Sequence, residues 1–496
     1  MRGDNDTERG EDLDTVVLGA GPAGLTAAHL LARRRRSAVV LEASETVGGI
    51  ATTVEFEGFR FDLGGHRFFT KLRPIERLWE EMLGDDFLTR PRLSRIYHRG
   101  QFFAYPLRAR DVVARLGFRE SMMCMLSYAW AQARRRSGGD RSFEDWVTAR
   151  FGRRLYDAFF RSYTEKVWGI PGTEIRAAWA AQRIKDFNLR LALLSMLGLR
   201  RRHVTTLIEE FRYPRLGPGQ MWDAFGRHAE KGGVPVLTNR RCVGMTHAGG
   251  IVTQVLVEHQ GRRTAHRVDG VISSIPLAEL VLGLDPPAPA EVQAAARSLR
   301  YRDLVLVALT MDGAAPFPDN WIYLHDPATR AGRVQNFGAW SDGMVPDGAG
   351  CLGVEYFCFA GDDVWEMPEE EAVAMGRDEL AGIGLIDPRQ VTGGVKVRVP
   401  KAYPIYDTRY EEAVSVIRSY LSGFANLEPC GRNGLHHYNN QDHSMCTAIL
   451  ATLNLLDAAG HDVWTVNTDD VFLEEGELED GPIGAALAPA EPVSAP

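Results

Sequence analysis

One segment near the start of the chain constrains the fold more than any other. An apolar run of β type at residues 15–18 is followed by a G-x-G-x-x-G turn from Gly19 to Gly24. A helical stretch from 22 to about 33 comes next, and a second β run at 38–41 ends at the acidic residue Glu42. This order is typical of a dinucleotide-binding β-α-β unit. The segment therefore predicts a Rossmann-like domain built on a parallel sheet.

The spacing gives each residue of the turn a role. Gly19 permits a tight turn, Gly21 lets the backbone approach a pyrophosphate, and Gly24 lets the helix pack closely on the strand. The N-terminus of the helix offers free N–H groups and a partial positive charge to the phosphates. Glu42 is expected to accept hydrogen bonds from both ribose hydroxyls of an adenosine. The residues predicted to contact the dinucleotide here are Gly19, Gly21, Pro22, Ala23, Gly24, Glu42 and Ala43.

The continuation of the chain favours FAD over NAD. Two glycine pairs follow, Gly48–Gly49 and Gly64–Gly65, and alternating apolar residues between them predict a short hairpin. The first pair, followed by Ile50, allows a second backbone approach to the dinucleotide, and the second pair allows one near a planar ring. Because a simple NAD domain has no such loop so early, we predict FAD as the cofactor.

Composition places the chain among globular proteins. Of its 496 residues, 45% are hydrophobic and 25% are charged, and the net charge of −8 argues against nucleic acid as a partner. The six cysteines lie far apart and form no C-x-x-C pair, which fits reduced thiols in a cytosol. The first residues lack the apolar stretch of a signal peptide. We predict a cytoplasmic protein without a metal site.

Two apolar runs bear on membrane contact. Residues 122–133 and 191–199 are both too short to span a bilayer, so no integral membrane segment is expected. The second run is flanked by Arg190 and by Arg200 to Arg202, which leaves attachment to a membrane surface open. A buried helix with a solvated basic end is the favoured interpretation of that run. The sequence also leaves a homodimer open.

The rest of the chain predicts an α/β fold in which the FAD-binding domain is discontinuous. A mainly helical substrate or cap region and an antiparallel-sheet substrate region are inserted between its parts. The predicted bounds are 13–75, 206–280 and 425–473 for the FAD-binding domain, 76–205 for the helical region, 281–424 for the sheet region, and 1–12 and 474–496 for disordered ends.

Periodicity supports these regions with individual elements. Residues 300–310 and 350–360 alternate as strands, which we assign to a second sheet. Residues 410–421 have the pattern of a helix, and so do residues 442 to about 459.

Several motifs resemble those of the UDP-galactopyranose mutases, flavoproteins related to amine oxidases and protoporphyrinogen oxidases. The most specific is GRRLYDAFFRSYTEKVWGIP (152–171), whose YTEK and WG look like the signature of the mutases. GGHRFFT (64–70) and YHRGQFFAYPL (97–107) are similar to their flavin-loop histidine and following hairpin. AYPIYD (402–407) and RSYLSGFANLEPCGRNGLHHYNNQD (418–442) resemble their C-terminal cofactor and substrate segment.

The resemblance implies a reaction and a set of residues. In that family, N5 of the reduced flavin attacks the anomeric carbon of a nucleotide-linked sugar, which then isomerises between pyranose and furanose forms without net redox. NAD(P)H would be an external source of the reduced flavin. The implied catalytic residues are His66, Arg183 and Arg333, the last two because guanidinium forks suit a diphosphate. The implied substrate-binding residues are Tyr163, Trp168, Arg183, Arg333, Tyr403 and Tyr438, and the further cofactor-binding residues are His66, Val243, Gly431, Arg432, Asn440, Gln441 and Ser444.

Three departures from the family pattern leave the sugar open. Phe69 stands where the compact mutases have another histidine, Asn440 replaces an acidic residue, and Ile50 replaces a polar residue. The alternative function is an FAD-dependent oxidoreductase acting on an amine, a sugar or a natural-product intermediate. Amine oxidases often have arginine after the glycine pair, so Ile50 weakens that alternative. A third interpretation, a flavoprotein kept as a binding module, has no feature in its favour.

Overall fold

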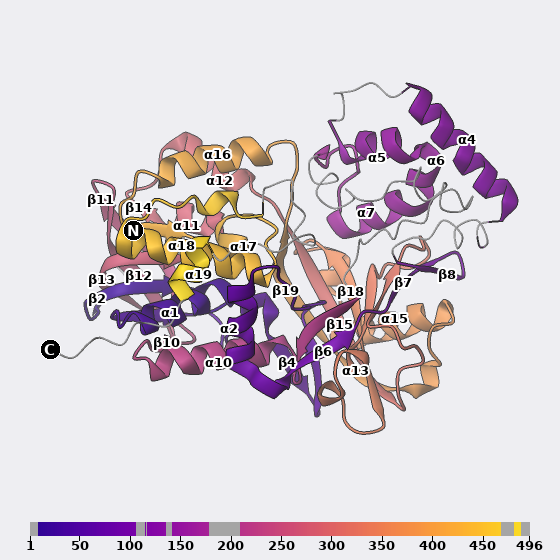
Figure 1. The fold of residues 1–496 in the computed structure, drawn as a ribbon, viewed down its shortest axis with the longest axis horizontal. Helices are drawn as coiled ribbons and strands as arrows, with labels where there is room; N and C mark the ends of the chain where they lie inside the picture. The colour runs from indigo at the N-terminus through magenta and orange to yellow at the C-terminus, as the bar shows by residue number, and fades with distance from the viewer. Residues whose placement is uncertain are drawn as a thin grey trace.

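Two large sheets dominate the structure, one at the left and one at the lower right of Figure 1. The computed structural model describes residues 8–105, 115, 117–134, 141–177, 209–467 and 481–487. Arg183 and the apolar run 191–199 lie outside these residues. Among the helices of the described ranges, none is long and apolar enough to cross a bilayer.

The first sheet has nine strands and carries the N-terminal β-α-β unit. Its order is β10-β3-β2-β13-β12-β11-β14, and both β1 and β20 also pair with β13. The strands β10, β3, β2, β13 and β20 run parallel, whereas β11, β12 and β13 form an antiparallel meander. The bounds are β1 Glu8–Arg9, β2 Leu13–Leu18, β3 Ala38–Leu41, β10 Val236–Leu237, β11 Arg241–Ala248, β12 Ile251–His259, β13 Arg262–Ser273, β14 Leu284–Asp285 and β20 Leu427–Pro429.

Helices cover both faces of this sheet because successive strand residues point to opposite sides. Val17 and Val40 pack against one set of helices, and their neighbours Val16 and Val39 pack against the other. The first set is α1 Pro22–Arg33, α2 Arg73–Leu83, α10 Pro218–Lys231 and α18 Gln441–Asp457. The second set is α11 Leu277–Leu282, α12 Ala290–Ser298 and α16 Tyr410–Leu421. The helices predicted at 410–421 and 442–459 are thus confirmed.

The second sheet has seven strands in the order β19-β15-β18-β17-β16-β7-β8. Its centre is antiparallel, and β7 joins parallel to β16. The bounds are β7 Ser94–His98, β8 Gln101–Ala104, β15 Tyr301–Asp312, β16 Trp321–Leu324, β17 Arg333–Asn336, β18 Ala349–Cys358 and β19 Val391–Pro404. Helix α15 (Glu369–Gly382) packs on one face. The strands predicted at 300–310 and 350–360 are β15 and β18, so their placement in a second sheet is confirmed.

A group of helices lies at the upper right of Figure 1, beyond the second sheet. It contains α4 Phe118–Arg134, α5 Phe143–Phe151, α6 Arg153–Leu155, a π-helical turn Tyr156–Phe160 and α7 Arg161–Trp168. Two small antiparallel pairs complete the strands, β4 Thr53–Phe56 with β5 Phe59–Asp62, and β6 Phe87–Pro91 with β9 Glu210–Pro214. Further short α-helices in the described ranges are α13 Phe337–Trp340, α14 Asp363–Glu366, α17 Gly431–Gly434 and α19 Gly481–Leu487.

The structure corrects three details of the sequence-based organisation. The region 76–205 contains strands β6, β7 and β8, because β7 pairs with β16 and thereby extends the second sheet. The predicted disorder of 1–12 does not hold for β1, which pairs with β13. The predicted disorder of 474–496 does not hold for α19, whose Ile483 and Leu487 pack on the core around α1 and α18.

Two features show that the glycine turn between β2 and α1 is tight. Gly19 has φ of 96°, a left-handed conformation that side chains disfavour. A Cβ added at Gly24 would lie 1.8 Å from the carbonyl oxygen of Gly19. The Gly19 oxygen is a backbone atom, and the added Cβ would be attached directly to the backbone of α1, so the contact has no room to relax.

We therefore expect Gly24→Ala to destabilise the first sheet. Overpacking of this kind costs about 1–3 kcal/mol, which urea denaturation would detect. Gly226→Ala in α10 is the matched control, because Gly226 is also helical and buried but a Cβ there meets no atom within 4 Å. This control should be neutral or slightly stabilising. Equal stability of the two variants would contradict the packing role of Gly24.

Candidate active site

Two glycine loops meet at the N-terminus of α1. The backbone N–H of Gly48 donates to the carbonyl of Ala20 at 2.8 Å, and a Cβ added at Gly49 would lie 3.4 Å from the Cα of Gly21. Helix α1 begins at Pro22 without a side-chain cap. Its first N–H groups are therefore left for an anionic ligand, as the sequence predicts for a pyrophosphate.

Glu42 lies at the end of β3 and its carboxylate is already engaged. One oxygen accepts from the backbone N–H of Ala20 at 2.7 Å, and the other accepts from both the backbone N–H and the hydroxyl of Ser44. A carboxylate has about four acceptor sites, so about one is left. Glu42 can bind one ribose hydroxyl directly, and a second requires Ser44 to move. That Glu42 accepts from both ribose hydroxyls at once stays a prediction.

The segment that precedes β11 contacts the chain at Glu42. The backbone N–H of Arg240 donates to the carbonyl of Glu42 at 2.7 Å, and that of Asn239 donates to Ser44 at 2.9 Å. Val243 follows at a register shift between β11 and β12, where the ladder is interrupted. A bulge frees backbone groups for other partners, which suits the predicted contact of Val243 with the cofactor.

The C-terminal segment returns to the same turn. A Cβ added at Gly431 would lie 2.8 Å from the Cβ of Ala23, and the Gly431 N–H donates to Thr447 at 2.9 Å. Asn440 is the N-cap of α18, and Gln441 accepts a hydrogen bond from Trp222 at 2.9 Å. The side chains of Asn440 and Gln441 thus have structural partners, while the N-terminus of α18, including buried Ser444, lies beside α1.

Arg432 holds two segments together. Its guanidinium donates to the carbonyl of Ala402 at 2.7 Å and to that of Asn439 at 3.2 Å. Its Cζ also lies 4.1 Å from the ring centroid of Tyr438 and 5.0 Å from that of Tyr403. Since Ala402 lies on β19, these contacts position the end of that strand. The charge of Arg432 also contributes a positive field at the site.

Arg333 forms the strongest ion pair of the site. Its Nε lies 2.9 Å from both carboxylate oxygens of Glu355, and its Nη2 lies 2.5 Å from one of them and 3.4 Å from the hydroxyl of Tyr403. The Glu355 side chain is 0% exposed and that of Arg333 is 17% exposed. Although burial lowers the pKa of Arg333, the Glu355 carboxylate outweighs it, and the pKa lies well above its usual value. Within the described parts of the chain, the hydrogen bonds of Arg333 use Nε and Nη2 and leave Nη1 unused.

His66 lies next to this pair on the second glycine loop. A Cβ added at Gly64 would lie 3.9 Å from a Glu355 oxygen and 4.0 Å from Arg333 Nη2, which places the loop on the ion pair. Burial, then Arg432 and Arg333, lower the pKa of His66 to about 3, so the imidazole is neutral. Its Nδ1 has no hydrogen-bond partner within the described part of the chain. A neutral ring with a free nitrogen fits the predicted contact with sugar or flavin.

The predicted aromatic residues form two stacks. Trp168 meets Tyr403 edge to face with centroids 6.3 Å apart, and Tyr403 stacks on Tyr438 at 5.7 Å and 16°. Tyr163 instead stacks on His325 at 4.4 Å and 15°. Burial raises the pKa of Tyr403 to about 12 and keeps both it and Tyr163 protonated. The structure thus brings His66, Arg333, Tyr403, Tyr438 and Trp168 together.

Four residues of the site escaped the sequence analysis. Glu355 and Gln335 complete the ion pair, since the Gln335 amide donates to Glu355 at 2.7 Å. Lys166 donates to the carbonyls of Leu324 and Asp326 and thereby fixes α7 to the second sheet. His325 covers one face of Tyr163. Glu355 had a readable signal, a charge inside the apolar run 350–359, whereas the roles of the others depend on contacts between distant segments.

The residues present fit an FAD. The two glycine loops leave no Cβ between them, α1 offers uncapped N–H groups, and Glu42 keeps one acceptor at the end of β3. These are the features that a dinucleotide requires. His66, whose Nδ1 has no hydrogen-bond partner among the described residues, follows the second glycine pair, where the sequence predicts the planar ring.

Comparisons with solved structures support the fold. The structure of reduced UDP-galactopyranose mutase is similar with a TM-score of 0.80 and 21% identity, covering 93% of this chain and 99% of that one. Putrescine oxidase bound to putrescine is similar with a TM-score of 0.59 and 16% identity, covering 91% of this chain and 99% of that one. At these identities the likeness concerns the fold.

Curated relatives match over short segments. All-trans-retinol 13,14-reductase of Danio rerio is 46% identical over 56 residues, which are 11% of this chain and 9% of the relative. Putrescine oxidase of Kocuria rosea is 42% identical over 59 residues, 12% of each protein. The matched part is therefore a small fraction of the relatives' length.

A family model covers far more of the sequence. The model described as flavin containing amine oxidoreductase matches residues 22–409, which include helix α1 with Gly24, Glu42, His66, and Arg333 with Glu355. That match, the α/β architecture and the mutase-like fold agree with one another. This chain belongs to the flavin containing amine oxidoreductase family, and its fold is similar to that of UDP-galactopyranose mutase.

Proposed function

We propose that this chain is an FAD-dependent enzyme that acts on a nucleotide-linked sugar and isomerises it without net redox. The observation that carries the proposal is the positive field at the buried site. Burial, then Arg432 and Arg333, lower the pKa of His66 to about 3, and among the described residues no hydrogen bond uses Arg333 Nη1. A diphosphate is a ligand that such a field attracts.

The same field disfavours a protonated amine. An ammonium group near Arg333 and Arg432 would be repelled, and the Glu355 carboxylate is already held by Arg333 and Gln335. Glu355 therefore has little capacity left to attract a cation. Electrostatics favour an anionic substrate over a polyamine.

Each residue then has a proposed task. When bound, the reduced flavin supplies the nucleophile. Glu42 and the glycine loops hold the dinucleotide, Arg333 binds the diphosphate of the substrate, and neutral His66 donates or accepts a hydrogen bond at the sugar. The aromatic stack of Tyr403 and Tyr438 excludes water on the substrate side. Arg183, which lies outside the described residues, stays a proposed second diphosphate ligand.

The alternative is an FAD-dependent oxidoreductase that oxidises an amine, a sugar or a natural-product intermediate. Membership of the amine oxidoreductase family and the short match to putrescine oxidase favour it. It differs from the main proposal in consuming an electron acceptor.

Reductant dependence tests the proposed function. FAD-loaded protein is incubated with UDP-galactose or a related nucleotide sugar, with and without dithionite or NAD(P)H, and the sugar products are separated. A mutase produces the isomer only when reduced and does not consume the reductant stoichiometrically. Bleaching of oxidised flavin by the substrate, with oxygen uptake, would instead establish the oxidoreductase.

The cofactor assignment predicts different effects at Gly21 and Glu42. A Cβ at Gly21 comes no closer than 3.9 Å to other protein atoms, so Gly21→Val should fold but lose FAD, because the side chain blocks the pyrophosphate. Glu42→Ala should weaken the binding of FAD by about ten- to a hundredfold. Ser44→Ala, the matched control, removes only the competing hydroxyl and should bind FAD at least as tightly. A yellow Gly21→Val protein with full flavin content would refute the assignment.

The diphosphate assignment predicts a specific loss in Arg333→Lys. Lysine keeps the charge for Glu355 but not the fork, so UDP should bind about tenfold or more weakly, measured by titration calorimetry. Arg95→Lys is the matched control, because Arg95 pairs through the same two nitrogens with buried Asp319, two strands away in the sheet. Its UDP affinity should stay unchanged. Equal UDP affinity in both variants would contradict the assignment.

A further inference from the structure

Helix α4 is attached to the rest of the helical group by polar contacts. Arg154 donates to both carboxylate oxygens of Glu120 at 2.7 and 2.8 Å, and its backbone N–H donates to the hydroxyl of Ser127 at 3.2 Å. The Gln132 amide donates to the carbonyls at the end of α5. The inward face of α4 also includes the buried Ser121 and Ala131, and Cys124 packs against the apolar cluster around Trp146. The side chains of this face are mostly small or polar.

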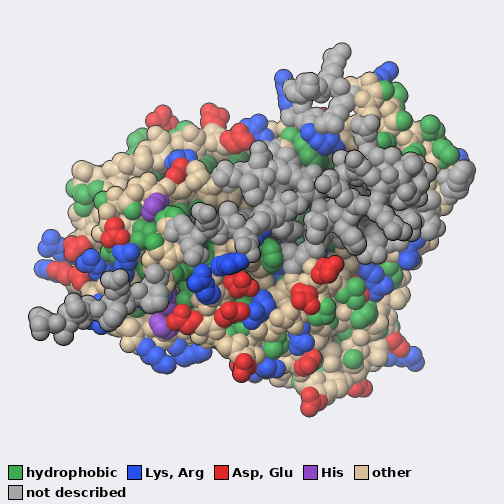
Figure 2. Space-filling view, in the orientation of Figure 1, with side chains coloured by type: hydrophobic (Ala, Val, Ile, Leu, Met, Phe, Trp, Pro, Cys, Tyr) green, Lys and Arg blue, Asp and Glu red, His purple; other side chains and the backbone are tan. Residues whose placement is uncertain are grey.

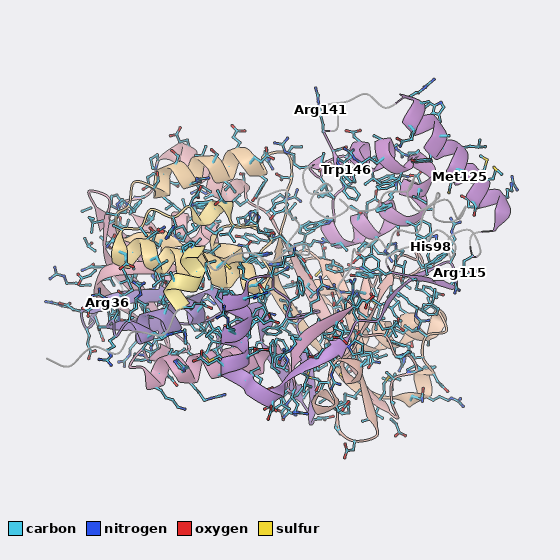
Figure 3. The ribbon with its side chains drawn as sticks, viewed as in Figure 1. Arg36, His98, Arg115, Met125, Arg141 and Trp146 are labelled. Carbon is cyan, nitrogen blue, oxygen red and sulfur yellow. The ribbon has the colours of Figure 1, made fainter. Side chains whose placement is uncertain are left out.

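The outward face of α4 is large and apolar. Figure 2 shows hydrophobic side chains gathered at the upper right edge of the molecule, over this helix, and Figure 3 places Met125 there. Five of the eleven exposed large hydrophobic residues in the described parts of the chain lie on α4, with exposures between 42% and 58%: Met122, Met123, Met125, Leu126 and Trp130.

This distribution is the reverse of that on a helix at a water-facing surface. Such a helix turns its apolar stripe to the core and its polar residues to solvent. Here Leu126 and Trp130, each 58% exposed, point outward, while Ser127 and Gln132 point inward. An apolar patch of this kind marks a surface that contacts a partner.

Arginines at both ends of this face indicate the chemistry of the partner. Arg115 precedes α4, Arg119 lies in its first turn, and Arg134 ends it, and all three are exposed. The Arg134 guanidinium lies 4.2 Å from the ring centroid of Trp130, so cation and apolar surface adjoin. In the sequence, Arg135 and Arg136 follow directly. This local positive charge contrasts with the net charge of −8 of the whole chain.

We propose that the outward face of α4 binds the surface of an anionic membrane. Met, Leu and Trp side chains enter the boundary between headgroups and acyl chains, and the flanking arginines pair with lipid phosphates. A helix of 17 residues, about 25 Å long, lies along the surface and does not cross it. This surface is distinct from the site at Arg333 and does not rest on the proposed function.

The charge pattern favours a membrane over a second copy of the chain. In a symmetric dimer the same patch meets itself, so the arginines of both copies would be brought together. Anionic lipid neutralises these charges instead.

Vesicle flotation of the full-length FAD-loaded protein tests the proposal. The protein should float with phosphatidylcholine vesicles that contain about 30% phosphatidylglycerol, less with pure phosphatidylcholine, and less at high salt. The triple variant Met122→Gln, Leu126→Gln, Trp130→Gln should bind roughly tenfold or more weakly. Arg119→Gln and Arg134→Gln should each lower binding to the anionic vesicles about fivefold, with little effect on pure phosphatidylcholine.

A matched control separates this face from general hydrophobicity. The control is the triple variant Leu237→Gln, Ile251→Gln, Leu282→Gln, which removes side chains that are 41–42% exposed on other elements. Its vesicle binding should be unchanged. Flavin content and melting temperature show that both triple variants are folded. Absence of vesicle binding by the wild type, or equal binding by the two triple variants, would overturn the proposal. A wild-type dimer that the α4 variant abolishes, without vesicle binding, would assign the face to self-association.

Discussion

The buried ion pair between Arg333 and Glu355 is the interaction on which the substrate side of the molecule depends. Glu355 is fully buried on β18, so its charge requires a close cation, and Arg333 on the neighbouring strand β17 supplies it. Removing one partner of such a pair costs about 3–5 kcal/mol. The pair fixes the rotamer of Arg333 and holds the loop of Gly64 against the second sheet. Among the described residues, the hydrogen bonds of this pair leave Nη1 of Arg333 unused.

The site unites the two sheets. The first sheet contributes the turns that suit a dinucleotide, and the second contributes Arg333 and Tyr403. Arg432 links them, because it follows β20 of the first sheet and donates to a carbonyl on β19 of the second. The result is a neutral His66 that feels the charge of two guanidinium groups, an arrangement that suits an anion beside an aromatic ring.

The parts of the site that sequence reasoning predicted are those encoded by local spacing. Gly19, Gly21 and Gly24 lie in one turn, and Glu42 ends the next strand, so their proximity follows from the β-α-β pattern. The hydrogen bonds that Glu42 accepts from Ala20 and Ser44 could not be predicted, because they depend on side-chain rotamers. The pairing of Arg333 with Glu355 joins residues 22 positions apart through strand register, which periodicity does not specify.

The central claim is that Arg333 receives the diphosphate of a nucleotide beside the flavin. A crystal structure of the FAD-loaded protein with UDP tests it most directly. The account predicts a phosphate oxygen within hydrogen-bond distance of Arg333 Nη1, with the Arg333–Glu355 pair intact and His66 on the same side of the flavin. A UDP molecule bound away from Arg333, or an Arg333 sealed from the ligand by Tyr403 and Glu355, would contradict it.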